Sequence, residues 1–380
     1  MAKKGFFLVA LLVVLAMGAW SAAAEPIKIG AIISYTGPAS VTGPGDENTI
    51  DLLLDEVGWK AGGRKIEVFK VDEGSGNPTE TVAGAKKLVE GDKVDVVIGP
   101  VLMHTAAAVA AYCGSAGVPH IVFSSNIKDI MNNKTVFLPQ GTGRGQVYVC
   151  GQYAYEKLGY RTASMLIADY AGGHEFCGGF IDGFEASGGK IVQKQLVPMM
   201  EANIAPYIGR IKEADCVAWW LVGPSSIAFP KQYRQYGLKM PLVYSTALPL
   251  EEPQLAQIAD DGLGMISSAL YSPEIDTKIN RDFVDKYKGR FGEYPGMAAM
   301  ECYVAMKLFL EAVKATGGDT GREKIMEALK GVKNLVTPAG TLSMTPERMG
   351  IQDQYILECS KKGDRYYWKV LAKYAEVHPR

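Results

Sequence analysis

The residue types that most often perform catalysis are few in this sequence and widely spaced. The histidines are His104, His120, His174 and His378, and His174-Glu175 lacks the second histidine of a zinc-protease helix. Residues 223–227 begin like the turn that carries a nucleophilic serine, but they end in isoleucine instead of glycine. The sequence has no glycine-rich phosphate loop followed by lysine and serine or threonine. We therefore expect a protein that is not an enzyme and that uses no cofactor or metal.

Side chains suited to reversible binding follow several of the short apolar runs. In open α/β sheets, ligands bind beyond the carboxyl ends of the strands. Hydroxyl, amide and aromatic groups at those positions favour a small organic ligand. The candidate ligand-binding residues are Tyr35, Met103, His104, Thr105, Ser124, Ser125, Asn126, Asp169, Tyr170, Trp220 and Thr246.

The elements that would position these residues form two consecutive blocks, 27–140 and 146–268. Short apolar runs alternate with amphipathic stretches in both blocks, which predicts an α/β fold with two doubly wound parallel-sheet lobes. The glycine-rich residues 141–145 are expected to connect the blocks. After residue 270 we expect three helices and two strands that complete the sheets of both lobes. Strands are predicted at 27–33, 65–71, 94–98, 119–123, 163–168, 190–196, 216–221, 241–244, 354–358 and 366–371.

The N-terminus has the three parts of a secretory signal peptide. Lys3 and Lys4 precede the apolar run 6–20, and small residues precede Glu25. We expect residues 1–24 to be removed and the rest to reach the periplasm. The predicted N-terminal lobe comprises residues 27–141 and 271–350, and the C-terminal lobe comprises residues 142–270 and 351–380.

All six cysteines lie after residue 112, at wide spacings without a Cys-x-x-Cys pair. This spacing argues against zinc and redox motifs. An oxidising compartment permits disulfides, so buried free thiols and one or two bridges remain alternatives.

The order of several short motifs resembles the branched-chain amino acid (leucine/isoleucine/valine-binding) family of type I periplasmic binding proteins. The resemblance rests on residues 27–30 with Thr36-Gly37-Pro38, residues 94–99, residues 117–126, residues 233–238, and Tyr294-Pro295 before a helix. It implies two lobes on a three-segment hinge and closure on a ligand. It also implies a soluble partner of an inner-membrane ABC permease. Candidate hinge segments are 141–145, 267–271 and 348–352.

The resemblance further implies that the loop after the third strand and residues 124–126 hold a ligand carboxylate. Thr105 begins a helix, and helix N-termini favour anions. Met103 stands where amino acid binders of the family often have serine. Thr246 stands where they have a carboxylate for the ligand ammonium, and Asp169 or Glu301 could replace it.

Aromatic residues at the strand ends favour an apolar or ring-shaped ligand. Because successive side chains of a strand face opposite sides, only one of Trp219 and Trp220 can face the ligand. We therefore predict an amino acid or a related organic acid, with an aromatic acid as the specific hypothesis.

The net charge of −1 gives no reason to expect a nucleic-acid partner. We expect a monomer that binds a small molecule and delivers it to an ABC permease. The alternative function is a periplasmic receptor that senses a ligand for a separate chemotaxis or signalling partner.

Overall fold

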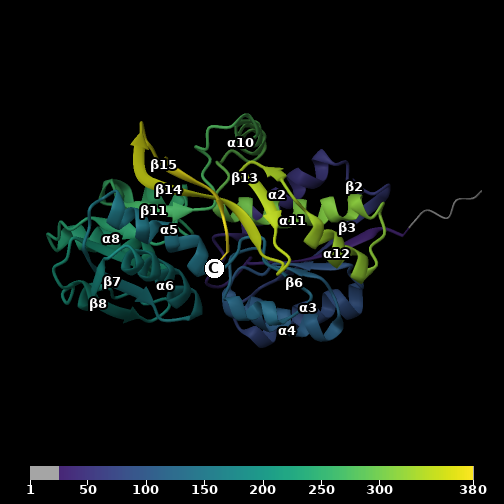
Figure 1. Cartoon of the computed structure of the whole chain (residues 1–380), viewed down its shortest axis with the longest axis horizontal. Helices are drawn as coiled ribbons and strands as arrows, with labels where there is room; N and C mark the ends of the chain where they lie inside the picture. The colour runs from purple at the N-terminus through teal and green to yellow at the C-terminus, as the bar shows by residue number, and fades with distance from the viewer. Residues whose placement is uncertain (1–24, 380) are drawn as a thin grey trace, which may run out of the picture.

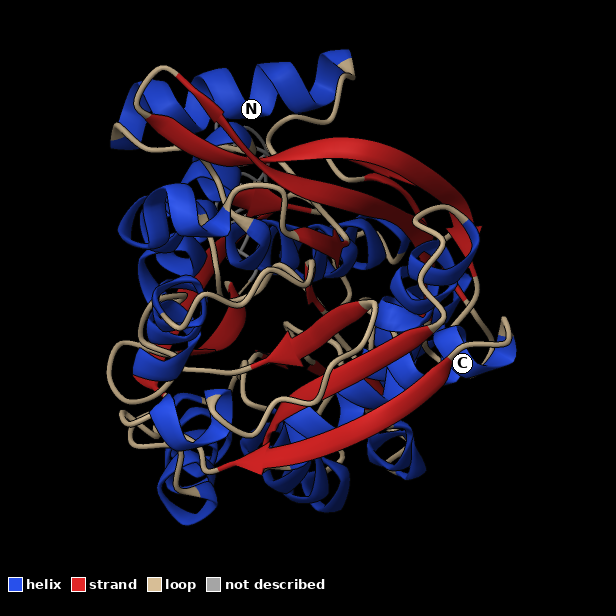
Figure 2. Cartoon of the chain, turned by 90° about the vertical axis from the view of Figure 1, so that its left-hand side faces the viewer, coloured by secondary structure: helices blue, strands red, loops and turns tan. Residues whose placement is uncertain are grey.

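The computed structural model describes residues 25–379, so the predicted signal peptide lies outside the described residues. Two α/β blocks lie side by side, with the first to the right in Figure 1 and the second to the left. Figure 2 shows helices on both outer sides of the sheets. The predicted fold class is confirmed.

The first sheet has six strands in the order β2-β3-β1-β4-β5-β6, and only the short β2 is antiparallel. Alternate side chains of the central strand β1 face two different cores, as the pleat of a strand requires. Ile29, Ala31 and Ile33 belong to the core that includes α2 and α11, whereas Ile32 packs with residues of α3 and α4. The elements of this block are β1 (Ile27–Ile33), α2 (Gly43–Glu56), β2 (Lys60–Ala61), β3 (Arg64–Asp72), α3 (Pro78–Lys86), η1 (Lys87–Asp92), β4 (Val96–Ile98), α4 (Met103–Ala116), β5 (His120–Ile121), η2 (Lys128–Asn132) and β6 (Val136–Phe137).

The second sheet has nine strands, of which β11, β10, β9, β7 and β8 run parallel. β14 (Gly350–Lys362) continues this sheet beside β11 in the antiparallel sense, and it also forms antiparallel pairs with β13 and β15. The elements are α5 (Gly143–Glu156), β7 (Thr162–Ala168), α6 (Ala171–Ala186), β8 (Lys190–Val197), α7 (Ala205–Ile208), β9 (Cys216–Trp220), α8 (Pro224–Gln235), β10 (Leu242–Tyr244), α9 (Glu252–Ile258), η3 (Ala259–Gly262) and β11 (Ile266–Ala269).

The C-terminal part of the chain contributes to both blocks. α11 packs against α2 in the first block, whereas β14 and β15 extend the second sheet (Figure 1). These elements are α10 (Lys278–Phe291), α11 (Met297–Ala315), α12 (Arg322–Gly331), β12 (Leu335–Thr337), β13 (Gly340–Met344), β14 (Gly350–Lys362) and β15 (Arg365–Val377).

Two segments that connect the blocks run beside each other. The Leu138 amide donates to the Arg348 carbonyl at 2.9 Å, and the Gly350 amide donates to the Leu138 carbonyl at 3.0 Å. The side chain of Gln352 adds hydrogen bonds to Pro139 and Gln140. The connecting segments therefore support each other by backbone and side-chain hydrogen bonds.

Candidate functional site

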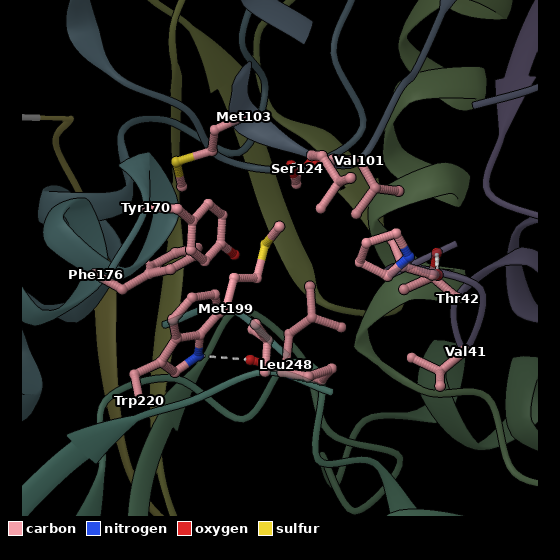
Figure 3. A pocket seen from close by; sticks show the side chains of 15 residues that line it. Val41, Thr42, Val101, Met103, Ser124, Tyr170, Phe176, Met199, Trp220 and Leu248 are labelled. Carbon is pink, nitrogen blue, oxygen red and sulfur yellow. Dashed lines mark hydrogen bonds between the residues drawn. The ribbon is translucent and has the colours of Figure 1, made fainter. Parts of the chain in front are cut away.

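A cleft that is partly open to solvent lies between the two blocks at the carboxyl ends of their strands (Figure 3). Apolar side chains predominate on both walls, and the first block adds the hydroxyls of Thr42 and Ser124. The first block contributes Pro38, Ala39, Val41, Thr42, Val101, Leu102, Met103 and Ser124. The second contributes Tyr170, Phe176, Met199, Trp220, Val222, Leu248 and Pro249.

Aromatic rings form one wall of this cleft. Trp220 stacks on Tyr170 with 5.9 Å between ring centroids, and Phe176 packs against Trp220 at 4.7 Å. The Trp220 indole nitrogen donates to the Leu248 carbonyl at 2.8 Å, which fixes the ring (Figure 3). Trp219 points the other way, into the core between Phe229 and Tyr244. The prediction that only one of the two tryptophans faces the cleft is confirmed.

Three helices begin at the cleft. Thr42 precedes α2, Leu102 precedes α4 and Tyr170 precedes α6, and all three line the cavity. None of these residues caps its own helix with a side-chain hydrogen bond in the described part of the chain. Because the first N–H groups of a helix have no intrahelical partner and carry partial positive charge, the cleft favours an anion.

The start of α4 already holds one carboxylate, which belongs to Glu73. Glu73 is 1% exposed and follows β3. Its oxygens accept hydrogen bonds from the Val101 and Leu102 amides at 3.3 and 3.0 Å. They also accept from the hydroxyls of Ser34, at 2.5 Å, and Thr105. The Thr105 hydroxyl is therefore buried against protein and does not line the cleft.

The three candidate residues in the loop that follows β5 make different contacts. Ser124 lines the cleft and donates to the Val101 carbonyl at 2.6 Å. Ser125 is buried and donates to the side chain of Gln146 at 2.7 Å. Asn126 is buried too, with its amide group on the Met103 carbonyl at 3.3 Å. Ser125 and Asn126 therefore secure the junction of the two blocks.

The first and second blocks touch at the rim of the cleft. The imidazole of His104 meets the ring of Tyr170 edge-on, with centroids 6.2 Å apart, and its Nε2 lies 2.8 Å from the Gly76 carbonyl. Burial is the largest cause that raises the pKa of Tyr170 well above its usual range, so this phenol stays neutral. The structure therefore represents a state in which the walls of the cleft are in contact.

Three further candidates lie away from the cleft lining. Tyr35 is 39% exposed, and burial followed by the nearby Glu47 raises its pKa. Asp169 pairs with His174 at 3.0 Å on the surface. Thr246 is fully buried and accepts a hydrogen bond from Gln146 at 3.2 Å. Met103, Ser124, Tyr170 and Trp220 are the candidates that the structure brings together in the cavity.

The match to known proteins is extensive. Residues 26–364 match the periplasmic binding protein family. The chain belongs to this family. It is 26% identical over 369 residues to the Leu/Ile/Val-binding protein homolog 6 of Brucella melitensis, covering 94% of this chain and 93% of that protein. The family assignment made from the sequence is confirmed, and with it the role of a solute-binding protein.

Two solved structures of solute-binding proteins of ABC transporters from Rhodopseudomonas palustris are closely similar. One, in complex with 3,4-dihydroxybenzoic acid, is 30% identical, has a TM-score of 0.86, and covers 93% of this chain and 98% of that chain. The other, in complex with 4-hydroxybenzoate, is 28% identical, has a TM-score of 0.87 and covers the same shares. Both are solute-binding proteins, as this chain is.

Several residues of the cleft were not singled out from the sequence. Phe176 lies in the second turn of α6, which begins at Ala171, and was missed because the candidates were sought at the ends of strands. Met199, Leu248 and Pro249 come from loops, and nothing in their local sequence indicates that they meet the first block. α5 was also missed, because its glycines and β-branched residues weaken helix propensity.

Buried carboxyl groups lie beneath the cleft between α2 and α11. Asp46 and Glu301 are 1% and 3% exposed, and both Asp46 oxygens and Glu301 Oε1 lack hydrogen-bond partners within residues 25–379. Burial is the largest cause that raises both pKa values well above their usual range. Glu251 adds to both, and Asp46 adds to that of Glu301. Over the same residues, no group of three histidine, cysteine or acidic side chains could hold a metal ion.

Two further findings concern the cysteines and the helices of residues 25–379. The six cysteines are buried and free, so the alternative of one or two disulfides is wrong. Among the described residues, no helix is both long and apolar enough to cross a membrane.

Proposed function

We propose that this protein captures a single-ring aromatic carboxylic acid in the cleft and delivers it to the permease of an ABC importer. The observation that carries the proposal is the combination of an aromatic wall with helix N-termini. Trp220, Tyr170 and Phe176 offer ring faces and edges to a flat apolar group. The starts of α2, α4 and α6 favour a negative charge beside it, with the Val101 and Leu102 amides before α4 already bound to Glu73.

The arrangement supports a defined orientation of such a ligand. The ring lies against Trp220 and Phe176, opposite the aliphatic side chains of Val101 and Leu102. The carboxylate lies toward Ser124 and the first-turn amides of α4, which begins at Met103. The similarity to the proteins in complex with 4-hydroxybenzoate and 3,4-dihydroxybenzoic acid supports the same class of ligand.

Closure of two lobes around the ligand completes the proposal. The lobes are residues 27–141 with 271–350 and residues 142–270 with 351–380, and they move about the connecting segments. The ligand stabilises the closed state by binding it more tightly than the open state. We propose that the protein acts as a monomer in the periplasm, after removal of residues 1–24.

A thermal-shift screen of residues 25–380, refolded to remove carried-over ligand, tests the proposal. A ligand at 100 times its Kd adds about 2.7 kcal/mol of stability. We expect benzoate and 4-hydroxybenzoate to raise the unfolding midpoint by several degrees. Benzamide tests whether the negative charge is needed, because it keeps the aromatic ring but has no carboxylate. Cyclohexanecarboxylate tests whether an aromatic ring is needed, because it carries the carboxylate on a saturated ring. A shift with leucine or valine, and none with aromatic acids, would overturn the proposal.

A further inference from the structure

The environment of Glu73 is that of an anion-binding site whose anion is part of the chain. Two backbone amides and two hydroxyls converge on its carboxylate. They come from three separate segments: the end of β1, the loop after β4, and the first turn of α4. Such a set of donors is what proteins use to hold a free carboxylate or phosphate at a helix N-terminus.

The occupied site has a direct effect on the cleft. Val101 and Leu102, whose amides bind Glu73, also line the cavity with their side chains. Thr105 and Ser34 fix the same carboxylate from behind and are fully buried. Hydrogen bonds to a charged group are stronger than those between neutral groups, so Glu73 holds this wall of the cleft in place.

We propose that Glu73 is an internal carboxylate that fills an anion site of the first lobe, and that it thereby positions residues 101–105 and directs a ligand's own carboxylate to other donors. Glu73 is a positioning residue, since its oxygens contact only protein donors. The proposal deepens the proposed function, because it explains why Thr105, an attractive partner for a ligand carboxylate, does not line the cleft. The donors left for a ligand are the α4 amides after Leu102, since the Ser124 hydroxyl already donates to the Val101 carbonyl.

The chemistry of the side chain supplies a sharp test. Glu73→Ala removes the four heavy atoms that make up one acetate ion. It leaves the Ser34 hydroxyl and the Val101 and Leu102 amides without this acceptor, while the Thr105 hydroxyl keeps the Leu102 carbonyl. Free acetate can reach the vacated space through the cleft, since the loop that donates Val101 and Leu102 amides forms its wall. An anion that fits should therefore replace the missing side chain.

We would measure unfolding midpoints of the wild type and of Glu73→Ala in sodium acetate, sodium formate and sodium chloride at equal ionic strength. We expect the variant to be destabilised, and acetate to restore several degrees of its midpoint while chloride does not. The wild type should respond equally to the three salts. Glu301→Ala is the matched control, because it removes the same atoms from a buried carboxyl whose Oε1 has no donor. We expect no rescue there.

Equal midpoints of Glu73→Ala in acetate and chloride would overturn the proposal, as would equal rescue of Glu301→Ala. If Glu73→Ala does not fold in chloride, its refolding yield in acetate is compared with its refolding yield in chloride instead. Glu73→Gln provides a second variant, with a single acceptor oxygen and no space for an ion, and we expect destabilisation without rescue. Because no cleft ligand is used, this result is independent of the ligand screen, and either proposal can fail alone.

Discussion

The carboxylate of Glu251 accepts a hydrogen bond from the backbone amide of Ala298 at 3.0 Å. Glu251 belongs to the loop that follows β10 in the second block, whereas Ala298 lies in the first turn of α11, which packs on α2 of the first block. Gly296, the residue before α11, has no side chain to cap that helix. Glu251 therefore caps a helix of the opposite block and joins the two walls below the cleft.

Removal of this contact should weaken ligand binding without any change to the cavity lining. Loss of a helix-capping side chain costs about 1–2 kcal/mol, so Glu251→Ala should raise the Kd roughly tenfold. Isothermal titration with the most effective acid of the screen measures the change. Glu293→Ala, in the neighbouring loop, is the control, and an equal loss of affinity in both variants would contradict a specific role for Glu251.

The same carboxyl should make closure depend on pH. Burial raises the pKa of Glu251 to about 7, opposed by the Ala298 and Met297 amides and increased by Glu293 and Glu252. If the open lobes expose Glu251 with its usual pKa near 4.5, closure takes up a proton between those two values. Affinity should therefore rise as the pH falls from 7.5 to 5.5. Titration in buffers of different ionisation enthalpy measures the uptake, which Glu251→Gln should abolish.

A glycine provides a steric test of the same contact. A Cβ on Gly296 would lie 2.0 Å from a Glu251 oxygen, although the backbone there has φ −91° and accepts any residue. Gly296→Ala should therefore hinder closure and weaken ligand binding while the separate lobes stay folded. Small-angle scattering with saturating ligand should show a larger radius than the wild type. Gly289→Ala, where a Cβ meets nothing within 4 Å, should leave both properties unchanged.

Substitutions of the two neighbouring tryptophans should affect different properties, ligand affinity for Trp220 and stability for Trp219. Trp220→Ala removes the ring that stacks on Tyr170 in the cleft, and we expect a loss of about tenfold in affinity for an aromatic acid. Trp219→Ala empties a fully buried core position and should cost about 3–5 kcal/mol of stability. Titration and urea unfolding of both variants check this division. A Trp219→Ala protein that folds but loses more affinity than Trp220→Ala would contradict it.

His120 should make the fold sensitive to mild acid. It is fully buried, its Nε2 lies 2.6 Å from the Gly99 carbonyl, and burial lowers its pKa to about 4. Its unfolded pKa is near 6.5, so the neutral side chain contributes stability above pH 6.5 that is lost as the pH falls toward 4. Glu251 acts in the opposite sense over part of this range. We would measure the free energy of unfolding in urea between pH 7.5 and 4.5 for the wild type and for His120→Gln. The variant should lose less stability than the wild type as the pH falls.

The sequence by itself determined the α/β architecture and the family, and it predicted the carboxyl ends of the strands as the place of binding. Apolar runs with a strand period, such as 27–33 and 163–168, predict their elements locally because the pleat sets which side chains are buried. It also indicated Met103, Ser124, Tyr170 and Trp220, since each follows or begins an element whose position the pattern fixes.

Only the tertiary structure decided which polar groups remain for a ligand. Thr105 and Glu73 are 32 residues apart, and their contact depends on how β3 and β4 are placed around β1. The contact of Glu251 with Ala298 depends on how the two blocks meet. Hydrogen-bond partners of this kind are set by packing between distant segments, and the spacing of residues along the chain carries no information about them.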